Sequence, residues 1–257
     1  MEISPIIMAM IATIFTWFVT LIGSSIVFFF KKINQKLLDI MLSISSGIMI
    51  AASFWSLLSP AIVMCEHLNM NKAIIPSLGI ICGGLLIIMM DYYFSIKLKN
   101  NSNKKKRCML LLSSITLHNI PEGLCVGVAF GSLPYNLDGI TIGSAIALTI
   151  GIAIQNFPEG GAVSIPLRCE GMSRKKAFFY GQLSAIVEPI AGIIGALLVF
   201  KIRTILPFCL SFAAGAMLYV VAKELIPESN NNDNNHYINI YLLIGFIIMM
   251  VLDVLLG

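Results

Sequence analysis

Long apolar stretches separated by short polar segments make up most of the chain. An α-helix needs about 20 apolar residues to cross about 30 Å of hydrocarbon, and eight stretches meet that length. We therefore predict an all-α, polytopic membrane protein that forms a single transmembrane domain over residues 1–257. The predicted spans cover, approximately, residues 6–30, 37–58, 73–96, 108–131, 138–167, 176–199, 204–227 and 238–256.

The composition agrees with this prediction. Hydrophobic residues make up 58% of the chain and charged residues 12%, whereas soluble domains have about 45–50% and about 25%. The mean hydropathy is +0.90. The first stretch lacks the basic region and cleavage site of a signal peptide, so we expect it to be a retained span. Six scattered cysteines without a Cys-x-x-Cys pair indicate neither a disulfide framework nor a zinc ribbon.

Basic residues are distributed unequally between the two sets of loops. The loops after the first, third and fifth spans carry 13 Lys and Arg residues, and the opposite loops carry 3. By the positive-inside rule the basic loops are cytoplasmic and both termini are extracytoplasmic. The basic run at 104–107 is interpreted as a topogenic loop near anionic headgroups, so no nucleic-acid partner is expected. We expect the protein to lie in the cell membrane, plasma or inner.

Two spans contain the same polar motif. Residues 118–123 read His-Asn-Ile-Pro-Glu-Gly, and residues 155–160 read Gln-Asn-Phe-Pro-Glu-Gly. The first copy lies in a span predicted to run outward and the second in a span predicted to run inward, so the copies form an inverted pair. A second similarity links residues 45–49 with residues 213–217, and each is followed by a proline. Inverted repeats with interrupted helices are typical of secondary transporters with a site near the bilayer midplane.

The carboxylates inside these motifs favour a bound cation. An acidic side chain at the bilayer centre costs about 2.5–3.5 kcal/mol, and Glu188 adds a third one midway through the sixth span. His118 and Glu122 share one helical face, as do Gln155 and Glu159. Imidazole, carboxylate and amide oxygens suit zinc, iron, manganese or cobalt, and the absence of cysteine argues against monovalent copper. The alternative is a cluster of interhelical hydrogen bonds or a proton relay.

These motifs, with Glu188-Pro189 and the stretch 51–58, resemble the ZIP (Zrt/Irt-like) metal-ion transporters, above all their GufA-like branch. The resemblance covers essentially all eight spans. It implies an inverted-repeat bundle, import into the cytosol, a homodimer, and an elevator-like motion of spans one, four, five and six against the other four. It also implies a dinuclear metal site bridged by two glutamates. The implied ligands are His118, Asn119, Glu122, Gln155, Asn156, Glu159, Glu188 and Met49.

One departure from the family pattern concerns the second metal position. Dinuclear members of the family typically carry Asp where this chain has Asn156. Three carboxylates rather than four would therefore face two divalent ions, although an asparagine still offers a carbonyl oxygen. We expect the two halves of the site to bind metal unequally.

Three classes of function are compatible with these residues. The favoured one is a secondary importer of divalent transition metals, with zinc foremost and iron, manganese, cobalt or cadmium as further candidates. The ion is then the substrate, and no prosthetic cofactor is predicted. No Gly-x-x-x-x-Gly-Lys-[Ser/Thr] loop is present, so ATP does not drive it. An intramembrane metallohydrolase is disfavoured because carboxylate ligands lower the Lewis acidity of the metal. A non-transporting metal sensor is the third, and ion flux separates it from a transporter.

Other polar residues have less specific interpretations. Asp91 and Asp253 lie near the ends of their spans, and we expect them to reach the interface or to pair locally. His236 is interpreted as a surface residue. Four residues could attract or receive an ion, or could simply be solvated: Glu66 and His67 in the predicted outer loop after the second span, and Glu224 and Glu228 at the cytoplasmic end of the seventh.

Overall fold

The computed structural model describes residues 4–29, 35–97, 103–135, 141–169, 171–201, 203–230 and 238–256. All regular structure in these ranges is helical, which confirms the all-α prediction. The α-helices are α1 (Pro5–Ser24), α2 (Ile26–Phe29), α3 (Gln35–Ala52), α4 (Ser59–His67), α5 (Ile74–Lys97), α6 (Asn103–Ser132), α7 (Ile142–Cys169), α8 (Arg174–Leu183), α9 (Val187–Lys201), α10 (Leu206–Val220), α11 (Ile226–Ser229) and α12 (Ile238–Leu256). Two π-helical segments, η1 (Ser53–Leu58) and η4 (Val221–Leu225), and two 3-10 turns, η2 (Leu133–Tyr135) and η3 (Arg203–Ile205), complete the chain.

Six helical segments among the described residues are long and apolar enough to cross a membrane. They are Pro5–Phe29, Asp39–His67, Ile74–Tyr93, Arg174–Val199, Leu206–Ser229 and Ile238–Leu256. They correspond to the first, second, third, sixth, seventh and eighth predicted spans, and they make the chain a multi-pass membrane protein. The other two predicted spans are α6 and α7, with 30 and 28 residues, which contain the paired motifs. That these two also cross the membrane stays a prediction.

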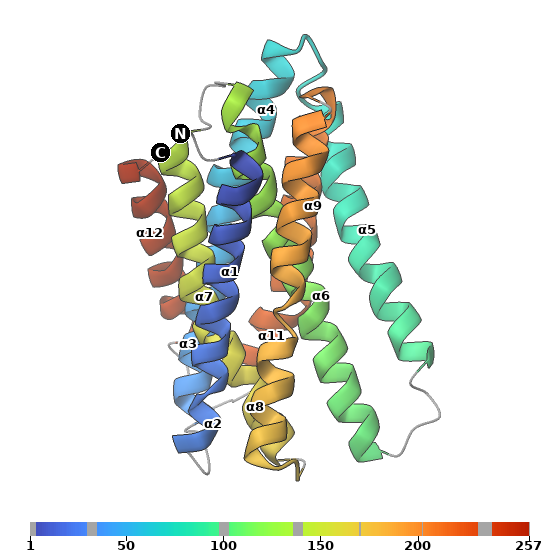
Figure 1. Cartoon of the computed structure of the whole chain (residues 1–257), viewed down its shortest axis with the longest axis vertical. Coiled ribbons are helices and arrows are strands. Elements are labelled where there is room, and N and C mark those ends of the chain that lie inside the picture. The colour runs from blue at the N-terminus through green and yellow to red at the C-terminus, as the bar shows by residue number, and fades with distance from the viewer. Residues whose placement is uncertain are drawn as a thin grey trace.

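The ends of the helices fall into two sets. α1 begins and α12 ends at the same end of the bundle (Figure 1). The opposite end holds the ends of α2, α5 and α7 and the starts of α3, α6 and α8, next to the basic segments of the sequence (Figure 1). This arrangement is the one that the predicted orientation requires, with the termini on the side away from the basic loops. Which side faces the cytoplasm stays a prediction.

Four close helix pairs build the bundle: α1 with α7, α6 with α9, α3 with α12, and α5 with α10. Glycines allow their backbones to approach. A Cβ atom on Gly47 would lie 1.9 Å from the carbonyl oxygen of Leu242, and one on Gly83 would lie 2.0 Å from that of Phe212. Small residues at such contacts allow dense packing, which holds helices together in lipid, where apolar burial gives no driving force.

The second and seventh spans correspond to each other in structure as well as in sequence. Gly47 corresponds to Gly215, and the start of η1 corresponds to the start of η4, at one common offset along the sequence. Each π-helical segment is followed by a proline in the first turn of the next helix, Pro60 in α4 and Pro227 in α11. Proline cannot donate a backbone hydrogen bond, so the preceding turn widens. The similarity between the second and seventh spans is therefore a shared backbone irregularity.

Two aspartates complete this correspondence. Lys223 Nζ in η4 donates to Asp91 Oδ2 in α5. Ser56 Oγ in η1 donates to Asp253 Oδ1 in α12 at 3.1 Å. Each π-helical segment thus forms a hydrogen bond to an aspartate on a neighbouring helix. The neighbour is α12 for η1 and α5 for η4. The prediction that Asp91 and Asp253 pair locally is confirmed.

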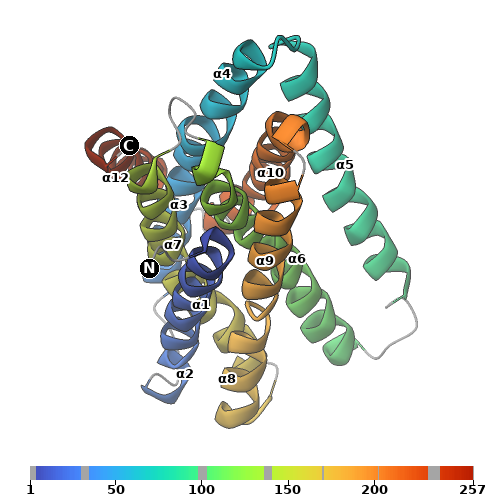
Figure 2. The same cartoon turned by 45° about the horizontal axis from the view of Figure 1, so that its top comes forward.

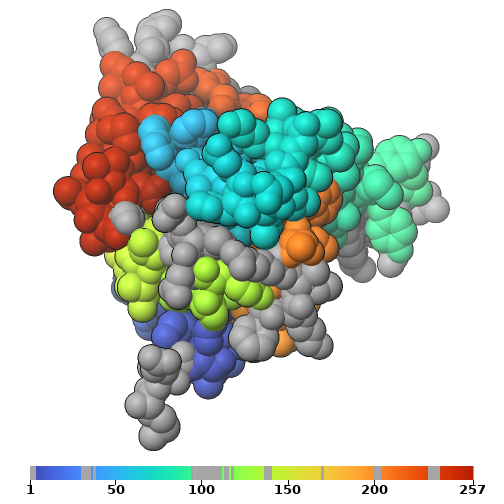
Figure 3. Space-filling model, turned by 90° about the horizontal axis from the view of Figure 1, so that it is seen from above, coloured from blue at the N-terminus to red at the C-terminus, as the bar shows by residue number. Residues whose placement is uncertain are grey.

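Around the four close pairs, α1 also packs against α6, α8 and α9, and α10 packs against α4 and η1. α3 in addition packs against α7, and α10 against α6, so the predicted division into two moving groups stays a prediction. Figure 2 shows α4 and α5 meeting at the top of the molecule, with α5 running down one side to the start of α6. Seen along the long axis, α4, α5 and α12 cover one half of the surface and α1 and α7 lie in the other (Figure 3).

Candidate metal site

The first motif lies on α6, which stays helical through Pro121. Asn119 is 1% exposed and Glu122 is fully buried. His118 precedes them on the same helix, but its side chain lies outside the described residues. The second motif lies on α7, which likewise stays helical through Pro158. Both motif prolines therefore lie within continuous helices, whereas the irregular segments of the described spans are η1, η4 and the turns at 184–186.

Hydrogen bonds join the two motifs and the sixth span. Gln155 Nε2 donates to Glu122 Oε1 at 2.6 Å, so the two copies of the motif face each other. Asn156 Nδ2 donates to Glu188 Oε1 at 2.9 Å and to its Oε2 at 3.0 Å. Gln155, Asn156 and Glu188 are fully buried, and Glu159 is 5% exposed. The structure thus gathers the polar residues of α6, α7 and α9 into one cluster.

Glu188 owes its place to a break between α8 and α9. Residues 184–186 form turns rather than a continuous helix, and Glu188 lies in the first turn of α9. A carboxylate is stabilised there because the helix dipole is positive at its N-terminus. The sequence predicts one continuous span over 176–199 and does not reveal this break, because Ser184-Ala185-Ile186 carries no strong turn signal.

One contributor that the sequence analysis missed is Thr16 of α1. Its Oγ1 donates to Glu188 Oε2, and its backbone carbonyl accepts from Asn156 Nδ2 at 3.3 Å. Thr13, Thr16 and Thr20 recur at helical spacing on the buried face of α1, whereas Ile11 and Phe18 on the opposite face are 55% and 52% exposed. Polar residues in register within an apolar span are the signal that could have found it.

The three carboxylates of the cluster act on one another. The charge of Glu122 interacts with those of Glu159 and Glu188, and Glu188 interacts with Glu159. Like charges repel strongly in a buried environment. The amide groups of Gln155 and Asn156 bond two of these carboxylates. Among the described residues, no group of three or more His, Cys, Asp or Glu residues is placed to hold a metal ion. The side chain of His118, the predicted imidazole ligand, lies outside the described residues.

Several buried oxygens in the cluster have no hydrogen-bond donor. Among the described residues, these include Glu122 Oε2, Gln155 Oε1 and Asn156 Oδ1. Leaving a buried polar group unsatisfied costs roughly 1–3 kcal/mol. A bound cation would satisfy these oxygens, because a cation interacts with hydrogen-bond acceptors and not with hydrogen-bond donors. The amide nitrogen of Asn119 also lacks an acceptor; a flipped amide would present its oxygen instead, and the two orientations are assigned from the hydrogen-bond network. These oxygens fit a divalent metal ion that is coordinated by oxygen atoms.

Met49 of α3 is buried in the main apolar core, and its role as a ligand stays a prediction. Glu66 and His67 lie in the last turn of α4, not in a loop, because the helix restarts at Ser59 with proline in its first turn. Glu66 forms an exposed ion pair with Lys72 at 3.7 Å. Glu224 lies in η4 and Glu228 in α11. His236 lies outside the described residues.

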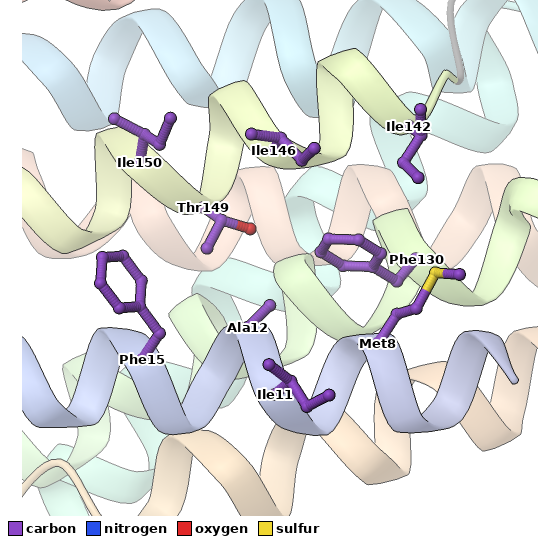
Figure 4. A pocket seen from close by; sticks show the side chains of 9 residues that line it. All are labelled: Met8, Ile11, Ala12, Phe15, Phe130, Ile142, Ile146, Thr149 and Ile150. Atoms are coloured by element: carbon purple, nitrogen blue, oxygen red, sulfur yellow. The ribbon is translucent and has the colours of Figure 1, made fainter. Parts of the chain in front are cut away.

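A separate apolar groove opens between α1 and α7, with a volume of about 440 Å³ (Figure 4). Phe15 of α1, Phe130 of α6 and Ile146 of α7 line it, and Thr149 is the one polar residue in the described lining. The groove offers no set of ligands for a cation, so the buried cluster and not this groove is the candidate metal site.

Comparison with known proteins agrees with the geometry. The model of the family described as "ZIP Zinc transporter" matches residues 100–253. The chain is 35% identical to zinc transporter ZIP11 of Xenopus tropicalis and 33% identical to that of Homo sapiens, over 99% of this chain and 98% of each relative. It is also 36% identical to zinc transporter GufA of Myxococcus xanthus, over 58% of this chain and 56% of that protein.

Proposed function

This chain belongs to the ZIP zinc transporter family, and we propose that it is a secondary transporter that imports divalent transition-metal ions, zinc foremost, into the cytosol. The two ZIP11 relatives named above are described as zinc transporters, and they match nearly the full length of this chain. Members of the family are transporters, so the chain is not an enzyme, and the metallohydrolase alternative is set aside. Iron, manganese, cobalt and cadmium are candidate competing ions, since they accept the same nitrogen and oxygen ligands.

The observation that supports this proposal best is the set of buried oxygens without donors. Glu122 Oε2, Gln155 Oε1 and Asn156 Oδ1 come from both motif copies and lie in the interior of the bundle. A cluster that served only to join helices would have paired these acceptors with donors. A cluster that binds and releases a cation leaves acceptors open between binding events.

The two proposed metal positions differ in one carboxylate. The first position takes His118, Glu122, Gln155 and Glu159, with Met49 nearby. The second takes Asn119, Asn156 and Glu188 and shares the two bridging glutamates. Each position has one open amide oxygen, Gln155 Oε1 at the first and Asn156 Oδ1 at the second, and both share Glu122 Oε2. Glu188 belongs to the second position alone, and both of its oxygens already accept hydrogen bonds. We therefore propose that the first position binds the cargo ion more strongly.

The proposed transport cycle moves the group formed by α1 and α6–α9 against the group of α3, α4, α5, α10 and α12. Both motifs and Glu188 belong to the first group, so the ion would travel with it. The two groups touch where Gly151 of α7 faces the thioether of Met249 in α12. A flexible methionine adapts to a sliding neighbour more readily than a branched side chain does.

Zinc uptake into proteoliposomes tests the proposal. The wild-type protein should accumulate radioactive zinc above the level of empty vesicles, and Glu122→Gln, which keeps the shape and removes the charge, should reduce the initial rate by at least about tenfold, equivalent to about 1.4 kcal/mol. Glu66→Gln makes the same chemical change on the exposed surface and should leave the rate unchanged. Competition with iron, manganese, cobalt and cadmium would rank the substrates.

Two results would overturn the proposal. Wild-type uptake equal to that of empty vesicles would leave a protein that binds metal without flux, which is the sensor alternative. Uptake by Glu122→Gln at the wild-type rate would mean that the ion does not pass through the cluster.

A further inference from the structure

We infer that Thr16 is a positioning residue whose hydroxyl holds Glu188 in competition with the metal ion, so that it weakens binding at the second position and speeds release. The inference rests on the proposed function, because it concerns the same cluster. It assigns a role to α1, a helix that contributes none of the predicted ligands.

Thr16 joins three helices through its side chain and its backbone. Its Oγ1 lies within hydrogen-bond distance of Glu188 Oε2 in α9 and 3.0 Å from the carbonyl oxygen of Thr13 in its own helix. Its carbonyl oxygen accepts from Asn156 Nδ2 in α7, and that same nitrogen donates to both oxygens of Glu188. Thr16, Asn156 and Glu188 therefore form a closed network, and all three are fully buried.

Close helix packing fixes the hydroxyl in this place. A Cβ on Gly192 of α9 would lie 2.6 Å from the side chain of Thr13, and one on Gly23 of α1 would lie 2.0 Å from the carbonyl oxygen of Phe157. α1 is thus pressed against both α9 and α7. Oγ1 of Thr16 is held within reach of two acceptors, Glu188 Oε2 and the Thr13 carbonyl oxygen, and its one proton is donated to either of them.

The hydroxyl and a metal ion compete for the same oxygen. A cation that binds Glu188 Oε2 must share or displace the donor from Thr16, and the hydrogen bond forms again when the ion leaves. Because metal binding breaks the hydrogen bond from Thr16 to Glu188, the free energy of that bond favours the metal-free state. For a hydrogen bond to a charged group, that strength corresponds to roughly tenfold or more in an equilibrium constant.

The neighbouring threonines provide a matched control. Thr20 Oγ1 donates to the backbone carbonyl of Thr16 at 3.3 Å, and Thr13 Oγ1 donates to that of Ala9 at 2.8 Å. Thr20 lies on the same buried face of α1 and is 2% exposed. Replacing its hydroxyl removes a hydrogen bond to the Thr16 carbonyl oxygen and leaves the two donors to Glu188, Thr16 Oγ1 and Asn156 Nδ2, in place.

The test compares zinc binding by calorimetry and zinc uptake in proteoliposomes for the full-length protein and its variants. Thr16→Val, which keeps the shape and removes the hydroxyl, should lower the Kd for zinc by about tenfold and lower both KM and kcat. Thr16→Ser should restore wild-type values, and Thr20→Val should match the wild type. If Thr16→Val does not fold, Thr16→Ala removes the same donor with less steric demand and carries the same expectation.

The outcomes separate this inference from the proposed function. A wild-type protein that neither binds nor transports zinc would contradict the proposed function itself. A transporting wild type with Thr16→Val or Thr16→Ala at unchanged or weaker zinc affinity would overturn only the role of Thr16. The same holds if Thr16→Ser behaves like Thr16→Val, since a hydroxyl at that position should be sufficient.

Discussion

Single atoms distinguish the two proposed metal positions. Asn156 uses its amide nitrogen to hold Glu188 and leaves its oxygen without a donor. Gln155 does the same with Glu122. In both cases the amide nitrogen donates a hydrogen bond to a carboxylate oxygen that a metal ion would otherwise bind. The difference is Thr16, which adds a second donor to Glu188 alone.

Replacement of Asn156 by aspartate tests this distinction. Asn156→Asp removes both hydrogen bonds to Glu188 and places a fourth carboxylate in the cluster. Without metal, we expect the free energy of unfolding to fall by at least about 1–3 kcal/mol, because buried carboxylates lose a donor and gain a like charge. With zinc, the number of ions bound per chain should rise. Thermal unfolding with and without zinc, together with calorimetry, measures both.

Asn71→Asp is the matched control for that experiment. Asn71 Oδ1 accepts from the backbone N–H groups of Ala73 and Ile74, and it is exposed. Aspartate can accept the same bonds, so neither stability nor zinc binding should change. An unchanged zinc stoichiometry in Asn156→Asp would contradict the view that the missing carboxylate weakens the second position.

Among the helices, the glycine that ends each motif is explained by packing. A Cβ on Gly123 would lie 2.4 Å from the carbonyl oxygen of Glu188, and one on Gly160 would lie 2.2 Å from that of Thr20. The two motif copies therefore bring α6 against α9 and α7 against α1 in equivalent ways. The motif supplies both the proposed ligands and the close contact that places them.

Adjacent glycines on α7 allow a direct test of this packing. Gly160→Ala should separate α7 from α1 and destabilise the protein by roughly 1–3 kcal/mol, as overpacking does. Gly161→Ala should be neutral or slightly stabilising, because its Cβ would meet no atom closer than Ile26 Cδ1 at 3.6 Å, an ordinary van der Waals contact, and alanine favours helix. Thermal unfolding in detergent compares the two, and equal melting temperatures would contradict the proposed contact.

The spans and the motif pairing could be predicted from the sequence, and the irregular backbone could not. Hydropathy encodes a membrane helix directly, and two similar motifs in antiparallel spans bring Gln155 and Glu122 together. The π-helical turns and the break at 184–186 depend on competing backbone hydrogen-bond registers, which no residue pattern specifies uniquely. Thr16 was missed because threonines in a span are most often packing residues.

In the bundle as a whole, the paired motifs and the paired π-helical segments lie on different sets of helices. The motif helices and Glu188 lie in one group, and the aspartates bonded to the π-helical segments lie in the other. The motion of one group of helices against the other stays a proposal. The homodimer and the orientation in the membrane stay predictions.

The most direct test of the account is the location of bound zinc by anomalous X-ray scattering from crystals of the zinc-loaded protein. The account predicts a peak between α6 and α7, at about 2.0–2.2 Å from Glu122 Oε2, with Gln155 Oε1 turned toward the ion. The peak should be lost in Glu122→Gln. Zinc bound elsewhere, with the hydrogen bond between Gln155 and Glu122 still in place, would contradict the account.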